Sequence, residues 1–208
     1  MKKKITIIDY DMGNIFNIFK SFEKLDCEAE LTNEPEKVLN AERLVLPGVG
    51  SFENGINNLK KYKLIDAINK YVLKSRPLLG ICVGMQLLMN KSFENGEHLG
   101  LNLIKGDVIK FENKNSDDKV KVPQIGWNNI NIKNINSKII SDIKDNEYMY
   151  FLHSYYVKPI ENVIITQTNY GGVEYCSILQ KNNIIGVQFH PERSAKEGLK
   201  ILNNFLKI

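Results

Sequence analysis

Short apolar runs alternate with amphipathic segments through the first half of the chain. The runs Ile5–Ile8, Arg43–Leu46 and Pro77–Ile81 are typical of buried strands. Between them, Asn14–Leu25 and Ile56–Leu73 have the pattern of helices. Strands separated by helices predict a mostly parallel sheet that is covered on both faces.

The second half has a different pattern, in which strands follow one another closely. Asn169–Gly172 and Lys181–Asn183 read as turns between strands, and Ala195–Leu206 reads as a final helix. The strands expected here are Val108–Phe111, Ile130–Ile132, Met149–Val157, Val163–Gln167, Cys176–Gln180 and Ile184–Phe189. We therefore predict an α/β fold with three layers. Its sheet is open, mixed and mostly parallel, with helices on both faces and an antiparallel, strand-rich C-terminal half.

The length and composition are those of one globular domain. A chain of 208 residues with 43% hydrophobic and 25% charged residues can build a single core, so we expect one domain over residues 1–208. The first apolar run is short and is interrupted by Asp9 and Asp11, which excludes a signal sequence. No apolar stretch approaches the roughly 18 to 20 residues that cross a bilayer. We expect a cytoplasmic protein without membrane contact.

The three cysteines, Cys27, Cys82 and Cys176, form neither an even disulfide set nor a CxxC metal pattern. This indicates a reducing compartment, and no metal or other cofactor is expected. The formal net charge of +4 comes from 28 basic and 24 acidic residues that are spread along the chain. Nucleic-acid binding is therefore not expected.

The segment Gly80–Gln86 has the form of a nucleophile elbow. Cys82 follows a predicted strand directly, begins a predicted helix and lies between two glycines that permit close backbone approach. A helix N-terminus also favours the thiolate, which is the reactive form. The alternative is that Cys82 is an ordinary small buried residue.

A base and a carboxylate follow near the C-terminus, in Val187–Glu192. A thiol nucleophile needs a base within hydrogen-bond reach, and that base needs a partner to orient it. His190 and Glu192 supply these two groups, and we expect Pro191 to keep the chain extended between them. A histidine beside a glutamate is common on protein surfaces, so this segment gains weight only together with Cys82.

A glycine-rich turn, Leu46–Phe52, follows another predicted strand. Acyl transfer develops negative charge on the substrate oxygen, and backbone N–H groups of such a loop can stabilise it. A simple tight turn or a general anion-binding nest has the same composition.

These segments together resemble the class I (triad) glutamine amidotransferases over essentially the whole chain. Among the branches of that family, the resemblance is to the glutaminase subunits of imidazole glycerol phosphate synthase, of histidine biosynthesis. The motifs that carry it, in chain order, are PGVGSF, GICVGMQLL, PQIGWN, YFLHSYY and VQFHPERS.

The resemblance implies hydrolysis of L-glutamine to glutamate and ammonia. Cys82 would form a γ-glutamyl thioester, with His190 as acid and base and Glu192 orienting it. The amides of Val83 and, after a peptide rearrangement, Val49 would form the oxyanion hole. The residues implied to hold glutamine are Gly50, Gln86, Glu94, Ser154 and Tyr155.

Plainer roles remain open for the residues that the resemblance assigns to glutamine. Gln86 lies one helical turn beyond Cys82 and is placed to cap local backbone, and Glu94 lies in a polar loop where carboxylates are usually solvated. His153 reads as a structural histidine whose strand presents neighbouring backbone groups. Val83 stands where leucine is common in the family, which matters little because its backbone N–H does the work.

The resemblance also implies a partner, since ammonia is useful only beside an acceptor site. That partner would be a cyclase with a (β/α)₈ barrel, forming a heterodimer with this chain. The residues implied to lie toward it are Asn14, Asn17, Trp127, Tyr150 and Arg193. A core position is the alternative for Trp127, and Arg193 stands where the family usually has lysine, so its interface ion pair is in doubt.

Three other functions compete with this interpretation. The glutaminase subunit of anthranilate or aminodeoxychorismate synthase usually has His-Gln where this chain has Met85-Gln86. A catalytically dead binding subunit conflicts with the complete set of Cys82, His190 and Glu192. A cysteine hydrolase of another amide leaves the GWN and HSYY segments unexplained. We further hypothesise that the isolated subunit is nearly inactive, because the amide of Val49 is misoriented until the partner binds its substrate.

Overall fold

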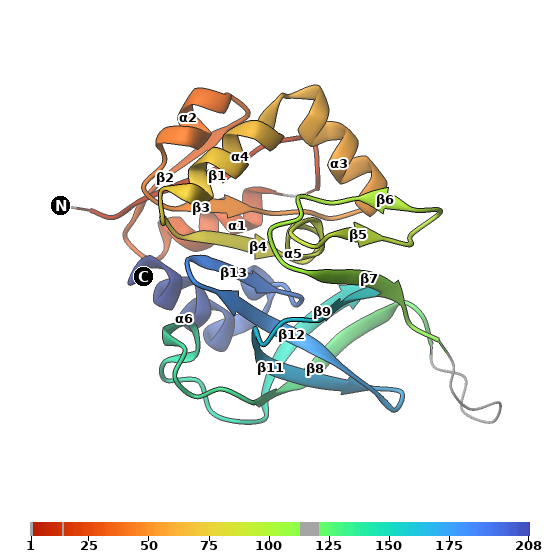
Figure 1. Ribbon diagram of the computed structural model, residues 1–208. Helices are drawn as coiled ribbons and strands as arrows, with labels where there is room; N and C mark the ends of the chain where they lie inside the picture. Colours follow the sequence, from red (N-terminus) through yellow and green to blue (C-terminus); the bar gives the residue numbers. More distant parts are fainter. Residues whose placement is uncertain (1, 14, 113–120) are drawn as a thin grey trace.

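The computed structural model describes residues 2–13, 15–112 and 121–208 (Figure 1). Asn14, which the resemblance places toward a partner, lies outside the described residues. Within the described ranges, none of the helices combines the length and the apolar character needed to span a bilayer.

The central element is a nine-stranded sheet with the order β2-β1-β3-β4-β13-β12-β11-β8-β9. The pairs from β2 to β13 are parallel, and the pairs from β13 to β9 are antiparallel. The predicted α/β class and the change of character between the two halves are therefore confirmed. The strands are β1 (Lys4–Ile8), β2 (Glu28–Thr32), β3 (Leu44–Leu46), β4 (Leu78–Ile81), β8 (Gln124–Ile132), β9 (Glu147–His153), β11 (Ile164–Tyr170), β12 (Val173–Lys181) and β13 (Ile184–Val187).

Helices cover both faces of the parallel strands, as the sequence predicts. In Figure 1, α2 (Pro35–Asn40), α3 (Phe52–Lys61) and α4 (Leu64–Leu73) lie together above the sheet. On the other side, α1 (Ile15–Glu23) packs against α6 (Ala195–Leu206). One apolar core extends between these layers because β1, β3, β4 and β13 are buried along nearly their whole length.

A second, four-stranded sheet lies beside the first, with the order β10-β7-β5-β6. Its strands are β5 (Lys91–Ser92), β6 (His98–Leu99), β7 (Gly106–Lys110) and β10 (Tyr155–Pro159). The short helix α5 (Val83–Leu87) packs between β4 and β10, and two single-turn 3₁₀ helices, η1 (Lys138–Ile140) and η2 (Pro191–Arg193), complete the structure. This second sheet forms one side of the pocket described below.

Two predicted elements are wrong in their continuity. The helix predicted over Ile56–Leu73 is two helices, because Lys63 adopts a left-handed backbone conformation (φ 57°, ψ 33°) that ends one and begins the next. The strand predicted over Met149–Val157 breaks at Ser154, and its two parts join different sheets. The break matters because it places Ser154 and Tyr155 at the junction between the sheets.

The topology brings distant chain segments to one edge of the large sheet. Strands β3, β4 and β13 are neighbours and run parallel, so their carboxyl ends meet at the same edge. Ligand sites of open α/β sheets lie at such carboxyl ends. The loops that follow these strands are Pro47–Gly50, the turn at Cys82 and Gln188–His190, which are the three segments that the sequence singles out.

Candidate active site

Cys82 occupies a sharp turn between β4 and α5. Its backbone has φ 54° and ψ −110°, a conformation that a non-glycine residue adopts only under strain. The Cys82 N–H donates to the Val187 carbonyl (2.8 Å), which ties the turn to β13. A Cβ atom on Gly84 would lie 1.8 Å from the Leu46 carbonyl oxygen, so only glycine fits there. Cys82 thus lies on the strand–turn–helix arrangement that the sequence predicts for this segment.

His190 lies beyond the end of β13, and Glu192 holds one side of its ring. Its Nδ1 atom lies 2.9 Å from Oε1 of Glu192, and both side chains are almost fully buried. The expectation that Pro191 keeps the chain extended is wrong, because Pro191–Arg193 form a 3₁₀ turn. That turn brings a carboxylate two residues away back onto the imidazole.

The Cys82 side chain is the second group that raises the pKa of His190. Burial lowers the pKa of His190, but the charge of a Cys82 thiolate, its hydrogen bond to the ring and the contact with Glu192 outweigh that effect. The net result is a raised pKa of His190, which favours the imidazolium form of its ring. The arrangement has the components of an activated thiol nucleophile.

The candidate oxyanion donors are not both available. The Val83 N–H donates to the Gly48 carbonyl at 3.3 Å, so the Gly48–Val49 peptide presents its oxygen to the nucleophile turn. Neighbouring groups hold this loop, since the buried Tyr10 hydroxyl donates to the Pro47 carbonyl. Val49 itself is 42% exposed. The oxyanion site is therefore closed by a carbonyl group in this conformation.

A pocket of about 220 Å³ opens beside Cys82. Its size suits a ligand smaller than drug-like molecules, whose pockets measure roughly 300 to 1,000 Å³. All five residues that the resemblance assigns to substrate binding line it. The lining residues are Val49, Gly50, Cys82, Val83, Gln86, Glu94, Pro123, Leu152, His153, Ser154 and Tyr155.

The polar groups of the pocket wall are already partly engaged. Nε2 of Gln86 donates to the Tyr155 carbonyl (2.9 Å), and that carbonyl also lies 2.9 Å from Nδ1 of His153. The Ser154 carbonyl accepts from the Phe111 N–H at 3.2 Å. In this conformation the 154–155 segment therefore has its carbonyl groups committed to the protein.

Glu94 and His153 both line the pocket, but their side chains have different roles. Oε2 of Glu94 accepts a hydrogen bond from the Phe52 N–H (2.6 Å) at the start of α3, so Glu94 supports this helix as well as lining the pocket. His153 is buried and holds backbone and side-chain partners, and burial lowers its pKa to about 4. A neutral structural histidine is what the sequence indicates at this position.

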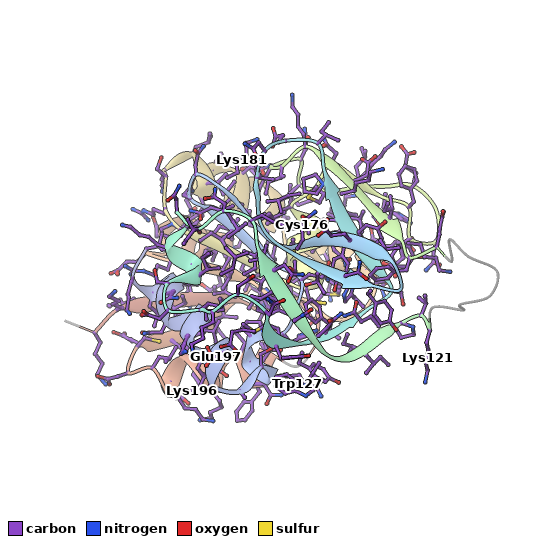
Figure 2. All side chains as sticks on the ribbon, turned by 90° about the horizontal axis from the view of Figure 1, so that it is seen from below. Lys121, Trp127, Cys176, Lys181, Lys196 and Glu197 are labelled. Atoms are coloured by element: carbon purple, nitrogen blue, oxygen red, sulfur yellow. The ribbon has the colours of Figure 1, made fainter. Side chains whose placement is uncertain are left out.

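The described residues predicted to face a partner lie on the surface near the triad. Trp127 is 53% exposed, which excludes the core position that the sequence left open. In Figure 2 it lies toward the periphery, whereas Cys176 lies in the interior. The Trp127 ring meets Tyr150 edge-on at 6.1 Å, and the guanidinium of Arg193 stacks 4.4 Å from the Tyr150 ring. Asn17 is also exposed, on α1.

Two buried residues near the triad were not singled out from the sequence, although both lie in the VQFHPERS motif. The Ser194 hydroxyl donates to the His190 carbonyl (2.7 Å) and accepts from the Tyr150 N–H (2.9 Å), which ties the triad turn to β9. Gln188 is fully buried beside Cys82. The period-two pattern of a strand gives no reason to expect buried polar groups there.

Comparisons with known proteins show the family to which the chain belongs. The family model described as "Glutamine amidotransferase class-I" matches residues 6–208. The chain is 44% identical to the imidazole glycerol phosphate synthase subunit HisH of Geobacter sulfurreducens, covering 97% of each chain. It is 46% identical to subunit HisH 1 of Methanococcus maripaludis, covering 98% of this chain and 99% of the relative. Among solved structures, PurLQS from Thermotoga maritima matches with a TM-score of 0.75 at 18% identity, covering 100% of this chain and 99% of that one. The structural match supports the fold alone.

Proposed function

Because this chain belongs to the class-I glutamine amidotransferase family, we propose that it is the glutaminase subunit of an imidazole glycerol phosphate synthase. Its reaction is the hydrolysis of L-glutamine to glutamate and ammonia, in the service of histidine biosynthesis. The observation that carries the proposal is the meeting of Cys82, His190 and Glu192 at the carboxyl ends of two paired strands, β4 and β13.

The chemistry follows from the side chains at this edge. The Cys82 thiolate attacks the carboxamide carbon of glutamine, and the electron pair of the C=O bond moves to the oxygen. His190 then gives its proton to the departing nitrogen, so that ammonia leaves and a γ-glutamyl thioester remains. Water, deprotonated by His190, attacks the thioester and releases glutamate with the Cys82 thiolate restored. Glu192 orients the imidazole and stabilises its charged form throughout.

The oxyanion that forms in both steps needs donors that the Gly48 carbonyl now excludes. The Val83 N–H is one donor, and rotation of the Gly48–Val49 peptide supplies the Val49 N–H as the second. Gly50, with φ 118°, gives the loop a residue that tolerates unusual backbone angles during this rotation. In this proposal, the conformation of the loop therefore decides whether both oxyanion donors are available.

Glutamine occupies the pocket beside Cys82 in this proposal. Glu94 supplies a carboxylate for the substrate's α-ammonium, and Gln86 offers its carbonyl oxygen because its amide hydrogens are directed to the Tyr155 carbonyl and to Gln188. Gly50, Ser154 and Tyr155 complete the contacts through backbone groups and the Ser154 hydroxyl.

The partner is a (β/α)₈-barrel cyclase subunit that receives the ammonia, and the two form a heterodimer in the cytoplasm. The exposed Trp127, with Tyr150 and Arg193 stacked beside it, provides an aromatic anchor of the kind that dominates binding energy in interfaces. Asn17, exposed on α1, is a further residue that we assign to this interface. We regard residues 1–208 as one amidotransferase domain.

A mixing assay with the candidate cyclase tests substrate, reaction and partner together. Glutamine should support formation of the imidazole product by the wild-type pair. With Cys82→Ala the glutamine-dependent product should disappear, and added ammonium salt should restore it because the cyclase is intact. Product formation from glutamine by the Cys82→Ala pair would disprove the proposal.

A further inference from the structure

The carboxamide of Gln188 lies directly against the candidate nucleophile. Gln188 is 0% exposed, and its backbone N–H donates to the Ser177 carbonyl at 2.9 Å. Its Nε2 atom lies 3.8 Å from Sγ of Cys82, and its Oε1 atom lies 3.3 Å from Nε2 of Gln86. One buried amide thus connects the sulfur with a residue of the pocket wall.

The hydrogen-bond chain fixes which end of Gln188 faces the sulfur. The Tyr155 carbonyl can only accept, so Gln86 must turn its NH₂ group toward it. The other hydrogen of that NH₂ group points to Gln188, which must therefore present its oxygen there. The NH₂ group of Gln188 is left facing Cys82. The Tyr155 carbonyl thereby determines, through Gln86 and Gln188, that the sulfur of Cys82 contacts a hydrogen-bond donor.

Besides His190, two polar groups of the described residues contact the sulfur, and they favour opposite protonation states. The thiol S–H is directed to the Leu152 carbonyl at 3.8 Å, an acceptor that favours the protonated form. The N–H groups of Gln188 are donors, so they favour the thiolate. Without Gln188, the Leu152 carbonyl would still contact the sulfur, and this contact opposes ionisation.

We propose that Gln188 is a catalytic residue that donates an N–H···S hydrogen bond to the Cys82 thiolate and orients it for attack. This inference rests on the proposed function, since it assigns a role beside the same nucleophile. The acceptor end of the amide holds Gln86 in the pocket wall, so one side chain aligns the nucleophile with the substrate site.

The test measures the ionisation of Cys82 itself, in the isolated chain and without glutamine. The rate of alkylation of Cys82 by iodoacetamide is followed by mass spectrometry from pH 5 to 10, because only the thiolate reacts. Other titratable groups face the sulfur from several elements, and all remain unchanged in the variants. They are Tyr10 after β1, Glu94 after β5, His153 on β9, Tyr155 on β10, and His190 and Glu192 at η2.

Two variants separate the donor from the rest of the side chain. Gln188→Leu removes both amide groups at similar size, and Gln188→Glu keeps an acceptor for Gln86 but replaces the donor with a carboxylate. We expect the pH midpoint of alkylation to rise by about one unit in Gln188→Leu, a tenfold slower reaction at pH 7, and further in Gln188→Glu. Thr166→Val is the matched control, since it breaks a buried hydrogen bond to Ser177 without touching the sulfur.

The outcomes distinguish this inference from the proposed function. A midpoint that stays at the wild-type value in either folded Gln188 variant overturns the inference, and so does an equal rise in Thr166→Val. Folding of each variant is checked by its thermal unfolding midpoint, and the two Gln188 variants are independent tests. If the midpoint rises as expected but the wild-type pair hydrolyses no glutamine, the role of Gln188 stands and the proposed function fails.

Discussion

Cys82, His190 and Glu192 stand at the ends of two hydrogen-bonded strands, whereas the Pro47–Gly50 loop opposite them is held by contacts that oppose its proposed role. On the first side, a hydrogen bond to β13 holds the strained backbone of Cys82 in place. The imidazole of His190 lies 2.9 Å from the carboxylate of Glu192. On the second side, the Gly48 carbonyl occupies the Val83 N–H. The nucleophile half is assembled in this conformation, and the oxyanion half is not.

The difference shows how such a site can be controlled without rearranging its core. Strand ends are rigid because moving them would break the sheet, while a glycine-containing loop changes one peptide orientation at small cost. A partner that binds beside Val49 needs to bias only that peptide. Each variant below removes a group from one half, so the two halves can be tested separately.

The largest loss is expected for His190→Asn, in the assembled half. Removing the acid and base should lower kcat/KM for glutamine in the partner complex by about 10⁴-fold, at the upper end for such groups. Alkylation of Cys82 at pH 7 should slow as well, because the thiolate loses its imidazolium. Glutaminase activity within tenfold of wild type would show that His190 is not the base.

A smaller loss is expected for Val49→Pro, in the unassembled half. Proline has no N–H, so the second oxyanion donor is absent even after the loop turns, and kcat should fall about 10²- to 10³-fold. Val49→Ala keeps the N–H and serves as the matched control with nearly full activity. The iodoacetamide rate of Cys82 should be unchanged in both variants. Equal kcat values in Val49→Pro and Val49→Ala would remove Val49 from the oxyanion site.

Glu192→Gln should cost about 10- to 100-fold in kcat, since a charge-assisted hydrogen bond is replaced by a neutral one. The charge of Glu192 contributes to the raised pKa of His190, so that pKa should fall in the variant. The titration is followed by NMR of the labelled imidazole. A fall in kcat with no change in the His190 pKa would mean that Glu192 acts in another way.

The smallest effect concerns stability and comes from His153, behind the pocket wall. Burial lowers its pKa to about 4, so the unfolded chain takes up the proton first as the pH falls. The contribution of His153 to the free energy of unfolding is therefore complete above about pH 6.5 and is lost toward pH 4. The free energy of unfolding should fall by about 2 kcal/mol between pH 7 and pH 5 from this residue. Urea denaturation of wild type and His153→Gln measures it. The variant should lack this part of the pH dependence, and parallel curves would contradict the assignment.

The nucleophile half was the more predictable part of the site. A cysteine after an apolar run and before a helix, and a histidine after another run, both follow from where strands end. Their meeting follows from the parallel pairing of β4 with β13. The 3₁₀ turn at Pro191 was not predictable, because a proline fixes its own φ without fixing the residues after it.

Other features were missed because the sequence carries no periodic signal for them. The edge strand β2 (Glu28–Thr32) is largely exposed, so it lacks the apolar pattern that marks a strand. The left-handed residue at Lys63 splits a helix without interrupting its apolar spacing. The donor from Gln188 to Cys82 depends on a chain of contacts across three segments, and only the folded arrangement brings these together.

The contrast between the two halves is tested most directly by two rates of this chain. Each rate is measured once on the isolated chain and once on its complex with the partner, which is bound to its own substrate. Iodoacetamide alkylation of Cys82 needs no oxyanion site, so its rate should change less than about threefold when the partner is added. Glutamine hydrolysis needs that site, so its rate should rise at least about 100-fold. Equal rates of glutamine hydrolysis with and without the liganded partner would contradict the account.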